Sequence, residues 1–254
     1  MCNERSTGRN KEFGTTRWSV VLLSAQSRAP GSDAALAELC KIYWYPVYAF
    51  VRRRGYDPND AEDLTQGFFL HLLDNKAVRR VSPRKGKFRS FLAVSLRNYI
   101  SDEAERMRSI KRGGQVEFVA LNSEFAEARY RLERTPSLTS EQIFDARWAT
   151  TLLEQVLISL RAEYEAQGKA CIFEVLKPFL TPGNSQPSPL YDQVANSLQV
   201  SVGSVKTLIF RLRKRYAFLL REQVGRTVGD PADVDEELHA LCEALLATKG
   251  ASEA

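Results

Sequence analysis

Apolar residues recur at three- and four-residue spacing along most of this sequence, and stretches that alternate between apolar and polar residues are scarce. One clear case is the stripe formed by Ala61, Leu64, Phe68 and Leu72. Residues at this spacing share one helix face, which can be buried while the polar positions face outward. The sequence therefore predicts an all-α fold.

Caps and helix breakers divide this pattern into separate helices. Gly55 ends the first helix, and Asp57 and Pro58 begin the second as its N-cap and first helical residue. Gly113 and Gly114 interrupt the pattern later. The expected helices cover residues 34–54, a stretch from residue 58 that includes Leu72, and residues 88–108, 148–166, 170–179, 190–198, 202–221 and 231–247.

The composition is that of a soluble globular protein. The chain has 254 residues, enough for two modest domains, and 44% of them are hydrophobic and 26% charged. No apolar run approaches the roughly 20 residues that span a bilayer, and the first residues lack the apolar stretch of a secretion signal. We therefore expect a cytoplasmic protein.

Cysteine and histidine are too sparse to predict a metal centre. The four cysteines lie far apart without a CxxC pair, and only His71 and His239 could join them. We expect reduced thiols, no metal and no cofactor.

Charge is concentrated in three segments. Residues 79–112 hold eleven basic residues against three acids, and residues 204–221 hold six basic residues without an acid. Residues 230–254 are the opposite, with seven acids against one lysine. Two basic blocks on separate predicted domains favour a polyanion that is contacted at two places.

The segment YDQVANSLQVSVGSVKTLIF, residues 191–210, has the spacing of a helix-turn-helix. This motif needs a small residue where the two helices cross, here Ala195, and apolar residues at fixed offsets that hold the angle. The apolar offsets are Val194, Leu198, Val200, Val205 and Leu208. The segment predicts a DNA-reading helix over residues 202–221, and a plain helical hairpin with a solvated basic face is the alternative.

With this helix-turn-helix and its two basic segments, the chain resembles the extracytoplasmic-function (ECF) sigma factors of the bacterial sigma-70 family. The resemblance covers residues 34–112 and 145–222, and two extensions suggest a larger subgroup. It implies a sigma factor, not an enzyme, that binds core RNA polymerase, melts and captures the minus-ten strand and reads the minus-thirty-five element. Its implied partners are the clamp and flap of core polymerase and promoter DNA, with no membrane; an anti-sigma factor or another regulator is also compatible.

The stretch AEDLTQGFF, residues 61–69, is similar to the clamp-binding helix of that family. Carboxylates also favour a helix N-terminus for electrostatic reasons alone, as part of a solvated face. The polymerase-binding residues that the resemblance implies are Asp60, Glu62, Asp63, Leu64 and Gln66.

The stretch RKGKFRSFLAVSLRNYISDEAER, residues 84–106, is similar to the promoter-melting part of the family. A basic loop over residues 82–87 beside Phe88 and Phe91 could hold a single strand by charge and stacking, although both rings fit a packed core better. The residues expected at the minus-ten DNA are Arg84, Lys85, Lys87, Arg89, Arg97, Asn98, Ser101 and Arg108.

The stretch from residue 194 to residue 220 is similar to the minus-thirty-five reader of the family. Val202 and Phe210 depart from it, because polar or charged residues are common at both positions. The promoter sequence therefore cannot be copied from relatives. The residues expected at the minus-thirty-five DNA are Ser201, Val202, Gly203, Ser204, Lys206, Thr207, Phe210, Arg211 and Lys214.

This reading divides the chain into five segments. They are an N-terminal extension (1–33), a sigma2-like domain (34–112), a connector (113–144), a sigma4-like helix-turn-helix domain (145–224) and an acidic C-terminal helical extension (225–254). A connector of about 30 residues could reach on the order of 100 Å, so reach would not limit contact with both promoter elements. We hypothesise that the terminal helix either docks on the reader helix and restrains DNA binding or contacts polymerase.

Two other functions compete with this reading. A ligand-responsive helix-turn-helix regulator would bind an operator without core polymerase, but it leaves the stretch 61–69 and the basic loop unexplained. An enzyme with a divalent metal on Asp60, Glu62 and Asp63 would need catalytic partners, such as a phosphate-binding glycine loop, that the sequence lacks.

Overall fold

The computed structural model describes residues 32–74, 87–109, 123–133, 137–180 and 191–250. Within these ranges it consists of helices joined by turns, with no strand. The predicted all-α fold is therefore confirmed. The loop at residues 82–86 and the N-terminal extension up to residue 31 lie outside the described residues.

The first two described helices are α2, Ser32–Arg53, and α3, Pro58–Asp74. Gly55 separates them with a φ of 95°, a left-handed conformation that costs glycine little. The Asp57 side chain accepts a hydrogen bond from the Asp60 backbone at 2.9 Å and caps α3. Both boundary signals in the sequence are thus confirmed, and α3 folds back against α2.

Helix α5, Phe88–Ser109, completes this group. Its buried side chains include Phe88, Leu92, Leu96 and Tyr99, and the Phe88 ring meets the Tyr43 ring of α2 edge to face at 5.4 Å. Gly67 lets α3 approach α5 closely, because a Cβ at this position would clash with the Tyr99 hydroxyl.

A short helix in the predicted connector, α6, Ser123–Leu132, is held to α2 by one carboxylate. Glu127 accepts hydrogen bonds from the Tyr48 hydroxyl and the Arg52 Nε, each at 2.8 Å, and from the Arg131 Nε at 2.9 Å. The hydrogen bond from Arg52 is the main reason why the pKa of Glu127 falls to about 2.

The longest helix, α7, Ser140–Ala166, begins with a capping box. Thr139 accepts a hydrogen bond from the Gln142 backbone, and the Gln142 side chain accepts one from the Thr139 backbone. The sequence-based start at residue 148 was wrong, because this cap adds two turns on the N-terminal side.

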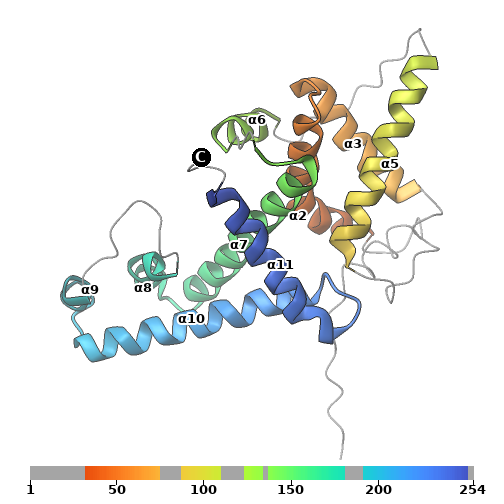
Figure 1. Cartoon of the computed structure of the whole chain (residues 1–254). Coiled ribbons are helices and arrows are strands. Elements are labelled where there is room, and N and C mark those ends of the chain that lie inside the picture. Colours follow the sequence, from red (N-terminus) through yellow and green to blue (C-terminus); the bar gives the residue numbers. More distant parts are fainter. Residues whose placement is uncertain (1–31, 75–86, 110–122, 134–136, 181–190, 251–254) are drawn as a thin grey trace, which may run out of the picture.

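Helix α7 belongs to two hydrophobic clusters. Its N-terminal half buries Phe144, Trp148 and Leu152 against the group of α2, α3 and α5. Its C-terminal half buries Val156 and Leu160 in a second cluster. Figure 1 accordingly shows α7 extending from one group of helices to the other.

The second cluster is formed with α8, Ala170–Leu176, the short 3-10 helix Lys177–Phe179, α9, Tyr191–Leu198, and α10, Val202–Gly225. Helix α10 extends beyond this cluster, and Val224 near its C-terminus lies in the first cluster. The two groups are therefore in contact through α10 as well as through α7.

The chain then turns back through the 3-10 helix Pro231–Asp233, capped by Asp230, into α11, Val234–Gly250. The predicted apolar stripe of this helix faces the interior: Leu241 is buried, and Val234, Leu238 and Leu245 pack against the first cluster. Helix α11 crosses α7 in Figure 1 and packs against it. The C-terminal extension is thus part of the folded core, whereas the predicted division into domains remains a prediction.

We predict that Gly67→Ala lowers the free energy of unfolding when residue 99 is tyrosine and raises it when residue 99 is phenylalanine. With Tyr99 present, the added methyl group should lower the free energy of unfolding by about 1–3 kcal/mol through overpacking. In a Tyr99→Phe background the nearest atom is the ring Cζ at 3.5 Å, so the higher helix propensity of alanine should raise stability by up to about 1 kcal/mol. Denaturant unfolding followed by circular dichroism measures both; the same sign in both backgrounds would contradict the packing described.

We also predict that Glu127→Gln lowers the free energy of unfolding by about 1–3 kcal/mol at pH 7. The folded-state pKa of Glu127 is depressed to about 2, so its stabilisation is complete above its ordinary pKa and is lost as the pH falls toward 2. The difference between wild type and variant should therefore shrink between about pH 4.5 and pH 2. A difference that stays constant over this range in urea unfolding would show that the charge of Glu127 does not hold α6.

Candidate nucleic-acid interface

Helices α9 and α10 form a helix-turn-helix where the sequence predicts one. The Val200 backbone donates to the Ala195 carbonyl at 3.0 Å, and Gln199 has a φ of 54°, which turns the chain sharply. Ala195 and Val205 are buried at the junction. Ser201 caps α10 by accepting a hydrogen bond from the Ser204 backbone at 3.1 Å.

The face of α10 that points away from the second cluster carries all but one of the residues expected at the minus-thirty-five DNA. The exception is Val202, which is half-buried and packs against the cluster. Phe210 is 65% exposed although it is aromatic. The structure brings the whole predicted set onto the first half of one helix and its cap. The exposed members are Ser201, Gly203, Ser204, Lys206, Thr207, Phe210, Arg211 and Lys214.

The basic residues of α10 fall into two groups. Arg213 donates to the Phe179 carbonyl at 3.0 Å, Arg215 pairs with Glu163 at 2.6 Å, and Arg221 pairs with Asp235 at 2.6 Å. Within the described residues, Arg211 and Lys214 form no ion pair and remain available to an external anion. Half of the basic block is therefore already bound to groups of the chain itself.

The first turns of α3 expose a group of carboxylates. Asp60 and Asp63 are exposed, and Glu62 is half-buried and accepts a hydrogen bond from Gln66 at 3.1 Å. Partial burial and the neighbouring Asp57 and Asp63 raise the pKa of Asp60. This face is suited to a cationic partner surface.

The structure corrects the expectation for Leu64, the fifth residue expected at polymerase. Its side chain is 5% exposed and lies in the first hydrophobic cluster. The stripe of α3 that includes Leu64 therefore packs inward, and no side-chain contact with a partner is available to it in this arrangement.

Helix α5 presents polar residues on the side away from its core. Arg97, Asn98 and Ser101 are all exposed, and the Ser101 hydroxyl donates to the Arg97 carbonyl at 3.0 Å. Arg84, Lys85 and the side chain of Arg108 lie outside the described residues. The three exposed residues lie within about one helical turn, where a nucleic-acid strand could contact them together.

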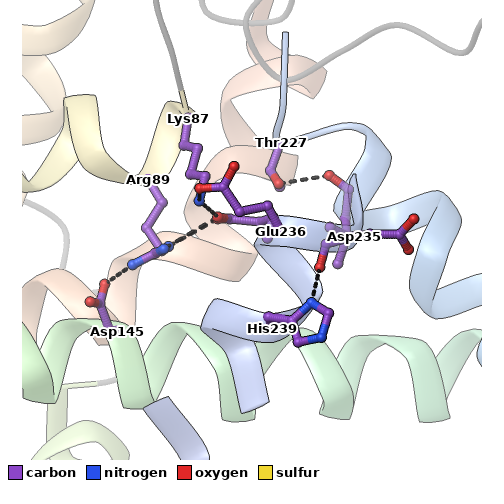
Figure 2. Close-up of polar contacts among 9 residues, drawn as sticks. Lys87, Arg89, Asp145, Thr227, Asp235, Glu236 and His239 are labelled. Atoms are coloured by element: carbon purple, nitrogen blue, oxygen red, sulfur yellow. Dashed lines mark hydrogen bonds and ion pairs between the residues drawn. The ribbon is translucent and has the colours of Figure 1, made fainter. Parts of the chain in front are cut away.

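The start of α5 is held by the C-terminal extension. The Phe88 backbone donates to the Thr227 carbonyl at 3.0 Å. Lys87 pairs with Glu236 at 2.8 Å, and the Arg89 Nε donates to Glu237 at 3.0 Å. Figure 2 shows Lys87 and Arg89 pointing toward α11, with Asp145 of α7 on the other side of Arg89.

Arg89 is consequently a structural cation, which corrects its expected role at the minus-ten DNA. It is 8% exposed, bonds Asp145 as well as Glu237, and lies over the Trp148 ring at 4.9 Å. Glu237 is fully buried, so its carboxylate needs this guanidinium. Burial raises the pKa of Asp145 although Arg89 lowers it.

Sequence reasoning missed this ion-pair network, and one signal could have found it. Glu237 lies three residues after Val234 and four before Leu241, which places it within the apolar stripe of α11. A carboxylate in such a stripe needs a buried cation. Its partner, 148 residues away in the sequence, could not be read from local spacing.

Among the residues that the structure describes, no three His, Cys, Asp or Glu side chains gather as metal ligands, and this includes the acidic face of α3. No described helix is long and apolar enough to cross a membrane.

Part of the chain is similar to a known protein family. Residues 44–110 match Sigma-70 region 2, and this stretch runs from α2 through α3 to the end of α5. No curated protein and no solved structure matches the chain. The match shows that the segment of α2, α3 and α5 is similar to Sigma-70 region 2.

We predict that Arg89→Leu lowers the free energy of unfolding by about 3–5 kcal/mol, because it leaves Glu237 buried without its main cation. The double variant Arg89→Leu/Glu237→Leu should recover most of this loss, since both charges are then absent from the interior. Chemical denaturation of the wild type, Arg89→Leu, Glu237→Leu and the double variant measures the coupling. If the free energy of unfolding that the double variant loses equals the sum of the losses in the two single variants, the network does not hold α11 to α5.

Proposed function

We propose that this protein is an ECF-type sigma factor that directs core RNA polymerase to specific promoters. The observation that carries the proposal is the Sigma-70 region 2 match over residues 44–110, which coincides with the helices α2, α3 and α5. The helix-turn-helix of α9 and α10, outside the match, supports a second DNA contact. Its site of action would be the cytoplasm, where polymerase and promoter meet.

Polymerase binding is assigned to the exposed start of α3. Asp60, Glu62, Asp63 and Gln66 lie within two turns, and the resemblance implies that these positions meet the clamp. A carboxylate face attracts a cationic surface over several ångströms and fixes the register of the contact. Leu64 packs in the first hydrophobic cluster and is not part of the proposed contact.

Strand capture is assigned to the exposed side of α5 and to Lys87 at its start. Arg97, Asn98 and Ser101 offer one cation and neutral hydrogen-bonding groups, a combination that holds a phosphate backbone and leaves base edges to be read by neighbouring groups. The expected contributions of Arg84, Lys85 and Arg108 remain part of the proposal.

Duplex reading is assigned to the first half of α10. Its capped N-terminus would enter the major groove, with Arg211 and Lys214 on phosphates. Phe210 is suited to contact with a thymine methyl group, which a polar residue at this position would not favour. This departure from the family pattern suggests that the protein has its own minus-thirty-five preference.

A transcriptional regulator that works without polymerase is the second candidate. The exposed N-terminus of α10 favours it, since nothing within the described residues covers this surface in the free chain. Specific duplex binding by the free protein, without a stable complex with core polymerase, would support the regulator.

Run-off transcription with purified core polymerase tests the proposal. We expect promoter-specific transcripts from host DNA only when this chain is added. At subsaturating protein, Asp63→Asn should reduce the transcript about two- to fivefold, and Asp63→Lys should reduce it further, because each weakens the attraction to a cationic surface.

The control is Glu243→Lys, which makes the same charge change at an exposed position of α11. It should leave transcription near the wild-type level. Equal losses from Asp63→Lys and Glu243→Lys would exclude the α3 face as the polymerase contact. Failure of the wild-type chain to bind core polymerase in a pull-down would overturn the sigma-factor assignment.

A further inference from the structure

Three consecutive acids of α11 each bind a cation from an element that is proposed to contact DNA. Asp235 pairs with Arg221 of α10 at 2.6 Å, Glu236 with Lys87 at 2.8 Å, and Glu237 with Arg89 of α5 at 3.0 Å. Carboxylates at these positions occupy cations that nucleic-acid phosphates would otherwise attract. The acidic run Asp235–Glu237 therefore lies between α5 and α10 and neutralises cations that belong to both.

The three pairs differ in their exposure. Glu237 is fully buried and Arg89 nearly so, which makes that pair a fixed anchor. The Glu236 side chain is 72% exposed and that of Lys87 is 20% exposed. The side chains of Asp235 and Arg221 are 69% and 53% exposed, but Arg221 lies outside the residues expected at DNA. Lys87 also pairs with the buried Glu237 at 3.3 Å. Because exposed ion pairs exchange readily with other ions, a phosphate group at Lys87 would replace the exposed carboxylate of Glu236 while the pair with Glu237 stays.

The anchor explains why Glu236 reaches Lys87. Glu237 and the buried turn residues Thr227 and Val228 hold α11 and its approach against the start of α5. Glu236 immediately precedes Glu237 on the same turn, and its carboxylate is thereby placed against the Lys87 ammonium. The hydrogen bond from Lys87 lowers the pKa of Glu236, which keeps its negative charge in place.

We propose that Glu236 is an intramolecular competitor of single-stranded DNA at Lys87, so that a strand phosphate must displace this carboxylate before it can bind there. The proposal rests on the assignment of strand capture to α5. It revises the hypothesis that the terminal helix covers the reader helix, because α11 lies at the C-terminal end of α10 and leaves its first half exposed. The free chain thus has a reduced affinity for strands that it would otherwise hold without polymerase.

The test is the salt dependence of single-strand binding by the full chain. Fluorescence anisotropy with a labelled single-stranded oligonucleotide is measured over a series of salt concentrations. Glu236→Gln should raise the affinity about two- to fivefold at low salt. It should also steepen the slope of log K against log salt by about 0.7, the change expected for one additional phosphate contact on a single strand.

Two further variants separate this mechanism from a general charge effect. Glu243→Gln removes the same charge from an exposed position on the same helix and should leave the slope unchanged. The double variant Glu236→Gln/Lys87→Gln should return the slope to the wild-type value, because the Lys87 ammonium is then absent. A gain that persists without Lys87, an equal gain from Glu243→Gln, or no strand binding by any variant would each overturn the proposal.

These outcomes are independent of the sigma-factor assignment. If the wild-type chain directs transcription but Glu236→Gln leaves strand binding unchanged, the competitor role fails and the proposed function stands. If the slope changes as expected but the chain does not bind core polymerase, the competitor role stands and the proposed function fails.

Discussion

The burial of the two halves of α7 in two different hydrophobic clusters is the constraint on which the rest of the structure depends. Trp148 and Leu152 pack against α2, and one turn later Val156 and Leu160 pack against the helices that carry the helix-turn-helix. Each such large side chain contributes roughly 1.5–3 kcal/mol when it is fully buried. Close-packed interiors tolerate little rearrangement, so the position of α7 on one group determines where the other group lies. The capping box at Thr139 ensures that the helix is long enough to serve both.

Much of this structure could be predicted from local patterns in the sequence. Gly55, Asp57 and the stripe of Ala61, Leu64 and Phe68 defined α2 and α3, and the offsets around Ala195 defined the turn before α10. The exposed face of α10 followed from the same periodicity, since an amphipathic helix has only one polar side. Reasoning from a helical period works where a helix buries a single face.

The prediction failed where partners come from distant parts of the chain. The apolar pattern predicts too late a start for α7, because its first turns are apolar only in part and its start is fixed by the capping box at Thr139. Arg89 was assigned to DNA because its neighbours are basic, whereas Glu237 and Asp145 draw it into the interior. A basic residue near a proposed DNA site therefore cannot be assigned from charge alone; its exposure decides between an external phosphate and an internal carboxylate.

Helix α7 also has a consequence for the two proposed DNA contacts. A flexible connector of about 30 residues would let them separate over a wide range of distances. In the arrangement described here, 27 helical residues join the two groups and span about 40 Å. The distance between the two proposed DNA surfaces is then fixed by this helix. If the proposed function holds, a promoter with one or two base pairs inserted between its elements would have to twist or bend to fit it.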